Sequence, residues 1–269
     1  MTVDIGGTKT LLAVFGDDGV VAEQVKFPTP QDYALFLKGL ESTVANLSTK
    51  DFLRACVAVP GRIDREHGVG LSCGNLGWKN VAIQADTEAI AHCPVIIEND
   101  AKLAGLSEAL MIIDEFKKTL YITISTGIGI SLITNGIIDT EIGDRGGASI
   151  MLEHDGVLTP WEHFASGKAI VAKYGKRASD IDDPAIWTEI ARDFSVGIID
   201  VIAITEPEIV IIGGGVGTHF DKFGGFLIKE LTKYETPMMP IPPLRKAGRP
   251  EEAVIYGCYE LIKAHDASR

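Results

Sequence analysis

Near its start the chain carries a polar, glycine-containing turn between two apolar runs, with the sequence Asp4-Ile5-Gly6-Gly7-Thr8-Lys9-Thr10. Adjacent glycines let the backbone approach a ligand closely and point successive N–H groups at an anion. Thr8 and Thr10 add hydroxyl donors, and Lys9 adds a positive charge. Asp4 would repel a phosphate unless a divalent cation lay between them, and Mg²⁺ bound through waters and phosphates suits that arrangement. The stretch indicates a nucleotide-phosphate site, with an ordinary glycine hairpin as the alternative.

Two further clusters of small residues have the composition of ligand-binding turns. Thr126 and Gly127 lie in the turn Ser125-Thr126-Gly127-Ile128-Gly129, which could clasp the far side of the same phosphates or could be a simple bend in a sheet. Glycines 213, 214 and 215 follow the apolar run 209–212, at the carboxyl edge where α/β sheets bind ligands. They could open a slot for the nucleotide ring. The chain contains neither a G-x-G-x-x-G nor a G-x-x-x-x-G-K-[ST] motif, so dinucleotide-binding and P-loop proteins are disfavoured.

Asn99 and Asp100 stand at the junction between an apolar strand and a helix, within the sequence Glu98-Asn99-Asp100-Ala101. A carboxylate at this place could take a proton from a hydroxyl as its oxygen attacks phosphorus. Asn99 could bind neighbouring hydroxyls. The alternative is an ordinary helix N-cap, where Asn and Asp are favoured, and the two roles are compatible.

The elements that must position these residues follow an α/β pattern repeated in two halves. Apolar runs predict strands at 3–5, 11–15 and 20–27, then within FLRACVAVPG (52–61) and CPVIIENDA (93–101). Helical spacing is present at 31–47, 161–173 and 184–205, and Pro250-Glu251-Glu252 is typical of the start of a last helix. Each half contains a strand, a polar glycine turn and a second strand, and Asn135-Gly136 predicts a hairpin turn. We expect weak internal two-fold symmetry.

Composition excludes several functional classes. A net charge of −12 makes nucleic-acid binding unfavourable. The four cysteines form no C-x-x-C pair, which favours reduced thiols and a cytoplasmic protein. No apolar run approaches ~18 residues and no signal peptide is recognisable, so we expect no membrane association.

Taken together, the motifs resemble those of the ROK family of bacterial sugar kinases and repressors. The stretches DIGGTKT, VAVPGRID, NLGWKN, ENDA, STGIG, EHFASGKAI and VIIGGGVG occur in the order and spacing of that family, from residue 3 to about 260. The resemblance implies an α/β, two-lobed ribonuclease H-like (actin/hexokinase-type) fold with a central cleft. We expect an N-terminal lobe of residues 1–116, joined by the C-terminal helix 251–269, and a C-terminal lobe of residues 117–250.

The same resemblance implies an ATP-dependent kinase acting on a hexose or an N-acylhexosamine. Asp100 matches the catalytic base, while Asn99, Glu162, Asn80 and Asp144 match sugar-contacting positions. The ATP phosphates would contact Gly6, Gly7, Thr8, Lys9, Thr10, Thr126 and Gly127, with Mg²⁺ held by Asp4 through water. Adenosine would rest near Gly213, Gly214 and Gly215. Because family members are often dimers or tetramers, the resemblance also suggests a homodimer.

One segment departs from the family pattern. Most members have G-E-x-G-H followed by a zinc-binding cysteine knuckle, whereas this chain reads GDRGGASIMLEHDGVLTPWEHFASG without those cysteines. One register sets Asp144 against the family Glu and Gly147 against the His; another places Glu141 and Asp144 there. We therefore expect no structural zinc and a locally different sugar contact.

Two other functions compete with a kinase. Repressors of this family carry an added N-terminal helix-turn-helix domain, and this chain starts only three residues before the phosphate turn, which argues against a repressor. A catalytically impaired sugar- or nucleotide-binding sensor is the other alternative, suggested by the altered segment. The presence of Asp4, the glycine turns and Asp100 favours the kinase.

Overall fold

The computed structural model describes residues 1–249 and 252–267, which form two units, Met1–Ser107 with Glu252–Arg269, and Glu108–Glu251. We describe each by itself. The division at 107/108 falls within helix α3 (Asp100–Leu110), ahead of the expected position at 116/117. Of the expected C-terminal helix 251–269, the structure describes α9 (Ala253–Ala267); the predictions for Pro250, Glu251 and residues 268–269 lie outside the described residues.

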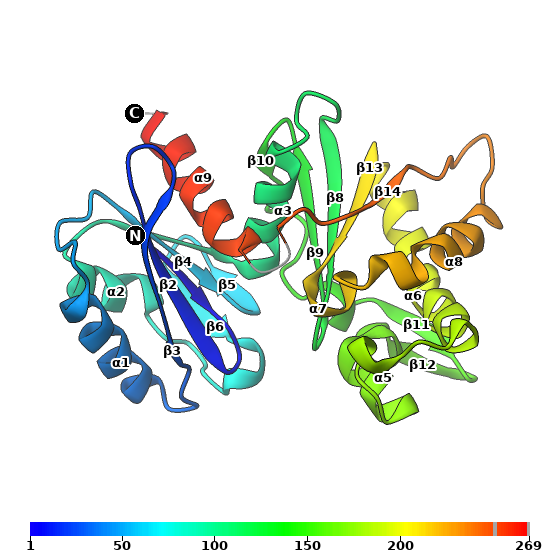
Figure 1. Ribbon diagram of the computed structural model, residues 1–269, viewed down its shortest axis with the longest axis horizontal. Coiled ribbons are helices and arrows are strands. Elements are labelled where there is room, and N and C mark those ends of the chain that lie inside the picture. The colour runs from blue at the N-terminus through cyan, green and yellow to red at the C-terminus, as the bar shows by residue number, and fades with distance from the viewer. Residues whose placement is uncertain (250–251, 268–269) are drawn as a thin grey trace. The chain divides into compact units, whose positions relative to one another are not determined.

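A five-stranded mixed sheet forms the centre of unit 1, in the order β3-β2-β1-β4-β7. Figure 1 labels three of its strands, β2, β3 and β4. Its strands are β1 (Thr2–Ile5), β2 (Lys9–Phe15), β3 (Val21–Pro28), β4 (Ala55–Val59) and β7 (Val95–Asn99). The first three form an antiparallel meander, and β1, β4 and β7 are parallel. A small hairpin, β5 (Arg62–Asp64) with β6 (Val69–Ser72), follows β4 and is succeeded by the short helix η1 (Gly74–Leu76).

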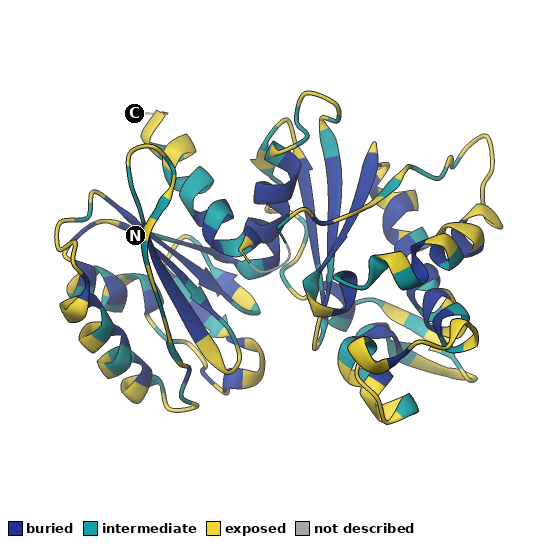
Figure 2. Cartoon of the chain, in the orientation of Figure 1, coloured by how far each residue is buried: buried dark blue, intermediate teal, exposed yellow. Residues whose placement is uncertain are grey.

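Helices cover both faces of this sheet because its parallel strands are apolar on both sides. Val57 faces the core shared with α1 (Tyr33–Asn46) and α2 (Ile83–Ala91). Cys56 and Ala58 point the opposite way and pack with Leu103 of α3 and Cys258 of α9. Figure 2 shows these central strands as buried.

Unit 2 repeats the same sheet pattern, in the order β10-β9-β8-β13-β14. The strands are β8 (Lys118–Ile124), β9 (Ile128–Thr134), β10 (Ile137–Ile138), β13 (Ile209–Gly213) and β14 (Leu244–Lys246). Again three strands form an antiparallel meander and two are added in parallel. The predicted internal symmetry is therefore confirmed at the level of strand order and direction.

The remaining elements of unit 2 surround this sheet. A separate hairpin pairs β11 (Met151–His154) with β12 (Val157–Pro160). The helices are α4 (Glu162–Ala165), α5 (Gly167–Tyr174), α6 (Pro184–Thr205), α7 (Gly214–Gly217) and α8 (Phe220–Thr232), with short 3₁₀ turns η2 (Gly146–Ala148) and η3 (Ala178–Asp180). Among the described residues no helix is both long and apolar enough to cross a bilayer.

Local sequence signals account for several boundaries. Asn135 and Gly136 both adopt left-handed backbone angles, with φ of 53° and 76°, as a tight hairpin turn requires. Helix α6 begins with Pro184 behind the Asp183 cap. The single helix expected over 161–173 is wrong: it is broken at Ser166, whose backbone is extended and whose Oγ caps α5 by accepting the Ala169 N–H at 3.2 Å.

The contact between α3 and α9 leads to a test of packing in unit 1. A Cβ added at Gly257 of α9 would lie 1.9 Å from the Leu103 carbonyl oxygen of α3. We expect Gly257→Ala to destabilise unit 1 by about 1–3 kcal/mol or more, because the two helices must separate. The matched control is Gly39→Ala in α1, where the nearest atom is 3.6 Å away and the helix should gain up to about 1 kcal/mol. Urea unfolding of both variants measures these changes. A free energy of unfolding for Gly257→Ala equal to that of Gly39→Ala would contradict the prediction.

Candidate active site

Two carboxylates meet at the carboxyl edge of the sheet in unit 1. Asp4 lies near the end of β1 and Asp100 directly follows β7, while β4 runs parallel between these strands. Carboxyl ends of parallel strands converge on one edge, which is where α/β sheets bind ligands. The structure therefore brings together the proposed magnesium ligand and the proposed base.

The electrostatics of Asp4 reflect this proximity. Burial, and then the nearby negative charge of Asp100, raise the pKa of Asp4 to about 7. A carboxylate that is buried beside another negative charge is stabilised when it binds a proton or a cation. Mg²⁺ commonly binds through one or two carboxylates, with waters and phosphates completing its shell, so the donor set at this edge fits that ion.

Asn99 makes a capping contact at this junction. Its Oδ1 accepts the Lys102 N–H at 3.1 Å, and its Nδ2 donates to the Gly61 carbonyl oxygen at 2.9 Å. The side chain thus ties the start of α3 to the turn after β4. Asp100 is the first residue of α3, half-buried, with Oδ1 accepting the Ala101 N–H at 2.8 Å. The helix-cap alternative therefore applies to Asn99.

The glycine turn between β1 and β2 is closed by a bond from the Gly6 N–H to the Lys9 carbonyl at 3.1 Å. A Cβ at Gly6 would lie 2.6 Å from that carbonyl oxygen, whereas a Cβ at Gly7 would meet nothing within 4 Å. Backbone above Gly7 is therefore open to a ligand, and Thr8 and Lys9 are exposed beside it.

Thr10 departs from the expectation for this turn. Its side chain is fully buried and its hydroxyl bonds to that of Thr29 at 2.8 Å, which joins β2 to the end of β3. The Thr10 hydroxyl therefore faces the interior of the protein, where it stabilises the turn, and it is not exposed beside Gly7. The sequence alone does not reveal Thr29 as its partner, because the pair is joined only by the register of β2 and β3.

Glu98 and Arg65 are residues to which sequence reasoning assigned no role. The buried Glu98 carboxylate forms a two-pronged ion pair with Arg65, whose Nε lies 2.9 Å from Oε2 and whose Nη2 bonds Oε1. Glu98 Oε1 also accepts the Asn99 N–H at 2.6 Å. Because buried charges in proteins are paired, the single acid in the apolar strand VIIEN predicts a cationic partner nearby. The sequence does not identify which cationic residue is that partner.

In unit 2, the second glycine turn is held by residues of the later EHFASG stretch. The Gly167 N–H donates to the Ser125 carbonyl at 2.7 Å, and the Ile128 N–H donates to Glu162 Oε2 at 3.3 Å. Thr126 is exposed, and the Glu162 carboxylate lies so near that a Cβ on Gly127 would be 2.7 Å from Oε2. Glu162, Thr126 and Gly127 are thus neighbours within this unit.

Glu162 is held in place by the preceding residue, Trp161. This indole is fully buried, donates from Nε1 to the Asp193 carbonyl at 3.0 Å, and packs so tightly that a Cβ on Gly197 would come within 2.2 Å of it. The Trp161 N–H also donates to the Ile150 carbonyl at 2.7 Å. These contacts fix the start of α4 without any cysteine.

The glycines after β13 divide into two kinds. A Cβ on Gly213 would lie 2.3 Å from the Tyr121 hydroxyl oxygen. Gly214 has a left-handed φ of 79°, and a Cβ there would lie 2.5 Å from the Thr123 hydroxyl oxygen. Gly215 is exposed and a Cβ there would meet nothing within 4 Å. The first two glycines therefore serve packing against β8, and Gly215 offers open backbone to a ligand.

The other proposed sugar contacts lie in different units. Asn80 is exposed in unit 1, with a left-handed φ of 53°, and Asp144 is half-buried in unit 2. Gly147 is buried, and a Cβ there would come within 2.8 Å of the Ile128 side chain. This backbone therefore has no room for an imidazole at position 147, which is the position that one alignment register pairs with the family His.

A structural metal site needs several donor side chains at one place. Within the described part of the chain no group of three or more His, Cys, Asp or Glu side chains is arranged to hold a metal ion. All four cysteines are unbridged and buried. The expectation that zinc is not required stays a prediction.

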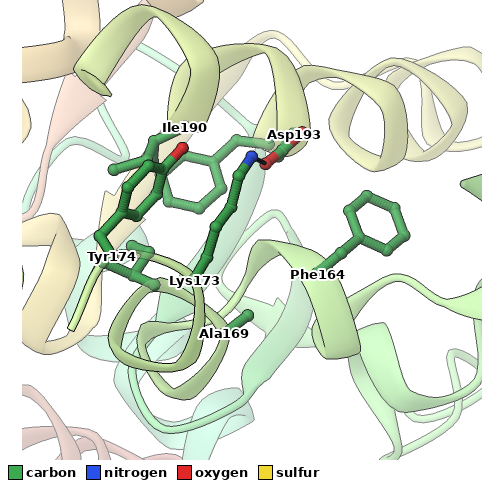
Figure 3. A pocket seen from close by; sticks show the side chains of 8 residues that line it. Phe164, Ala169, Lys173, Tyr174, Ile190 and Asp193 are labelled. Carbon is green, nitrogen blue, oxygen red and sulfur yellow. Dashed lines mark hydrogen bonds and ion pairs between the residues drawn. The ribbon is translucent and has the colours of Figure 1, made fainter. Parts of the chain in front are cut away.

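Unit 2 also contains a hollow of about 650 Å³ between α4, α5 and α6, and none of the predicted site residues lines it. Figure 3 shows the adjoining wall, where Lys173 and Asp193 point toward each other. Their charged groups are 3.3 Å apart, and Lys173 also lies 3.6 Å from Glu189. Burial raises the pKa of Asp193, and the Lys173 charge opposes that rise. Because these charges are paired within the wall, we assign the hollow no ligand.

Comparison with known proteins identifies the family of this chain. The profile of the ROK family matches residues 1–265, so the chain belongs to the ROK family. An N-acetylmannosamine kinase of Escherichia coli (strain SE11) is 28% identical over 242 residues, which are 81% of this chain and 83% of the relative.

Solved structures show the fold. A ROK family glucokinase from Streptomyces griseus in complex with glucose and AMPPNP has a TM-score of 0.81 at 22% identity, covering 96% of this chain and 97% of that chain. A ROK family transcriptional regulator, a homologue of the E. coli MLC protein, has a TM-score of 0.82 at 18% identity, covering 97% of this chain and 77% of the regulator's. The chain has the α/β, ribonuclease H-like fold of actin- and hexokinase-type ATPases, as the sequence predicted.

The raised pKa of Asp4 predicts a pH-dependent stability. An ordinary Asp titrates at 3.8, and the folded protein raises this pKa to about 7, so the folded state holds the proton more tightly. The stabilising contribution is complete below pH 3.8 and is lost as pH rises through 7. In the absence of Mg²⁺ and nucleotide, we expect Asp4→Asn to have a higher Tm than wild type at pH 8, with the difference shrinking toward pH 5.

Thermal unfolding across this pH range measures the effect. The control is Asp17→Asn, an exposed acid in the turn after β2, whose Tm should follow wild type at every pH. Parallel Tm profiles for Asp4→Asn and wild type would show that Asp4 does not titrate in this range.

Proposed function

We propose that this protein is an ATP-dependent sugar kinase, which transfers the γ-phosphate of ATP to a hydroxyl of a hexose or an N-acylhexosamine. The observation that carries the proposal is the meeting of Asp4 and Asp100 at one sheet edge beside an open glycine turn. A metal-binding carboxylate and a base close to a phosphate site are the parts that phosphoryl transfer needs. The kinase relatives in the same family support this assignment.

Asp100 would act as the general base. It would accept the proton of the sugar hydroxyl while that oxygen attacks phosphorus, and a positioned base typically contributes about 10²–10⁴-fold. Its place at the start of α3 is set by the Asn99 cap, which fixes the first turn of the helix. A rigid junction suits this role because general-base catalysis depends on hydrogen-bond distance.

The proposed ATP contacts follow the glycine turns of the sequence. We assign the phosphates to Gly6, Gly7, Thr8 and Lys9, and to Thr126 and Gly127, and adenosine to the region of Gly213–Gly215. The structure supports Gly7 and Gly215 most directly, because the space above their backbone is open. Mg²⁺, held by Asp4 through water, would supply neutralisation of the phosphate charge. Thr10 is left out of the phosphate contacts because its hydroxyl is bonded to Thr29.

The sugar would be recognised through hydroxyl contacts from Asn99, Glu162, Asn80 and Asp144. Asn99 has one amide hydrogen left after its bond to Gly61, which can be donated to a hydroxyl oxygen. The Glu162 carboxylate can accept hydrogen bonds from sugar hydroxyls while it retains the bond from the Ile128 N–H. The alternative is a catalytically impaired sensor that binds sugar or nucleotide without turnover, favoured by the absence of space for an imidazole at Gly147.

A substrate screen with an Asp100 variant tests the kinase. We expect ADP release in the presence of ATP, Mg²⁺ and at least one hexose or N-acylhexosamine, and a loss of about 10²–10⁴-fold in kcat for Asp100→Asn, with ATP binding retained. The control is Asp17→Asn, which should retain wild-type turnover. Binding without turnover across the whole panel would favour the sensor, and near-normal turnover of Asp100→Asn would reject Asp100 as the base.

Glu162 provides a second test, directed at sugar recognition. Glu162→Gln removes the charged acceptor of hydrogen bonds from the sugar hydroxyls, and a hydrogen bond to a charged group contributes about 1.5–3 kcal/mol. We therefore expect KM for the sugar to rise about 10- to 100-fold. The matched control Glu235→Gln removes an exposed acid of the same unit and should leave KM unchanged. Steady-state kinetics with the sugar found in the screen decide this, and an unaltered KM for Glu162→Gln would remove Glu162 from the sugar site.

A further inference from the structure

A buried ion pair lies directly behind the junction that carries Asn99 and Asp100. The Glu98 side chain is 6% exposed and that of Arg65 is 28% exposed. Arg65 follows β5 in the small hairpin, whereas Glu98 belongs to β7 of the main sheet, so the pair joins two separate elements. Both nitrogens of the guanidinium fork engage the carboxylate, a geometry that Lys cannot reproduce.

The same carboxylate also holds the backbone of the junction. Glu98 Oε1 accepts the Asn99 N–H at 2.6 Å, and Asn99 in turn caps α3 through the Lys102 N–H. A continuous series of bonds therefore leads from Arg65 through Glu98 to the first turn of α3, where Asp100 stands.

The energetics of a buried ion pair make Arg65 necessary for this arrangement. Removing one partner of such a pair leaves an uncompensated buried charge, which is strongly destabilising, whereas replacing both by neutral groups is often tolerated. Without Arg65, the Glu98 carboxylate would have to move toward water or take up a proton. Either change weakens its hold on the Asn99 N–H.

We infer that Arg65 is a positioning residue, which acts through Glu98 to set the orientation of Asp100. The inference rests on the proposed kinase function, in which Asp100 is the base. A displacement of about 1 Å at a reacting group can cost about 10²-fold in rate. Arg65 thus affects the chemical step through the junction.

The first experiment compares Arg65→Gln with Arg62→Gln, using the sugar found in the screen. We expect Arg65→Gln to lower kcat by about 10- to 100-fold, with KM for ATP changed less than about twofold. Arg62 is an exposed arginine of the same hairpin, and its variant carries the same charge change, so its kcat should match wild type. An unchanged kcat for Arg65→Gln would overturn the inference.

The double variant Arg65→Gln/Glu98→Gln distinguishes action through Glu98 from a direct role. Removing the carboxylate charge relieves the unpaired burial, so we expect the double variant to regain at least about tenfold in kcat over Arg65→Gln. Arg65→Ala should regain activity on addition of guanidinium ion. A double variant as slow as Arg65→Gln would show that Arg65 does not act through Glu98.

A readout independent of turnover separates this inference from the kinase assignment. The backbone amide ¹H–¹⁵N chemical shifts of Asn99 and Ala101 report the geometry of the junction, because the Asn99 N–H donates to Glu98 and the Ala101 N–H donates to Asp100. We expect both shifts to change in Arg65→Gln and to match wild type in Arg62→Gln. Unchanged shifts in Arg65→Gln overturn the positioning role even if no sugar is phosphorylated, while a wild-type protein without turnover on any sugar overturns the kinase alone.

Folding of the variants is checked in the same samples by near-UV circular dichroism and urea unfolding. A loss of kcat that the unfolded fraction accounts for in full would show a structural role and overturn the inference. A double variant that regains stability but not kcat per folded molecule would overturn it as well.

Discussion

The convergence of parallel strands on one edge is the constraint on which the proposed chemistry depends. β1, β4 and β7 run in the same direction, so the residues at their carboxyl ends must be neighbours. Asp4 and Asp100 are ninety-six positions apart in the chain, yet the charge of one raises the pKa of the other. Two negative charges at a partly buried edge repel each other, and a bound cation would relieve that repulsion. The edge is therefore suited to cation binding.

Close backbone approach is the second recurring feature. Glycine occurs where a side chain would collide with a neighbour, as at Gly6, Gly213 and Gly257, and also where the backbone faces open space, as at Gly7 and Gly215. Glycines needed for packing and glycines that face open space occur within the same motifs, as Gly6 and Gly7 do. A glycine-rich motif therefore combines residues needed for packing with residues that can face a ligand, and only the surroundings separate them.

Packing and hydrogen bonds around Trp161 hold the start of α4 in unit 2. Trp161 is fixed by two hydrogen bonds and by contact with Gly197, and it sets the start of α4, from which Glu162 reaches the turn at Gly127 and Ile128. A buried aromatic residue with a satisfied indole N–H provides a rigid support through packing. The short β11–β12 hairpin directly precedes it in the chain.

The sequence by itself determined the α/β class, the repeated strand–turn–strand units and the family, because these depend on local patterns: apolar periodicity, glycine turns and the order of motifs. It also determined that residues 99 and 100 stand at a strand–helix junction. Only the tertiary structure decided that Asn99 makes the cap, that Thr10 is bonded to Thr29, and that Arg65 is the partner of Glu98. The Thr10–Thr29 bond, the Arg65–Glu98 pair and the Asn99–Gly61 bond that orients the capping side chain join residues 19, 33 and 38 positions apart. They therefore follow from strand register and packing, which no local pattern encodes.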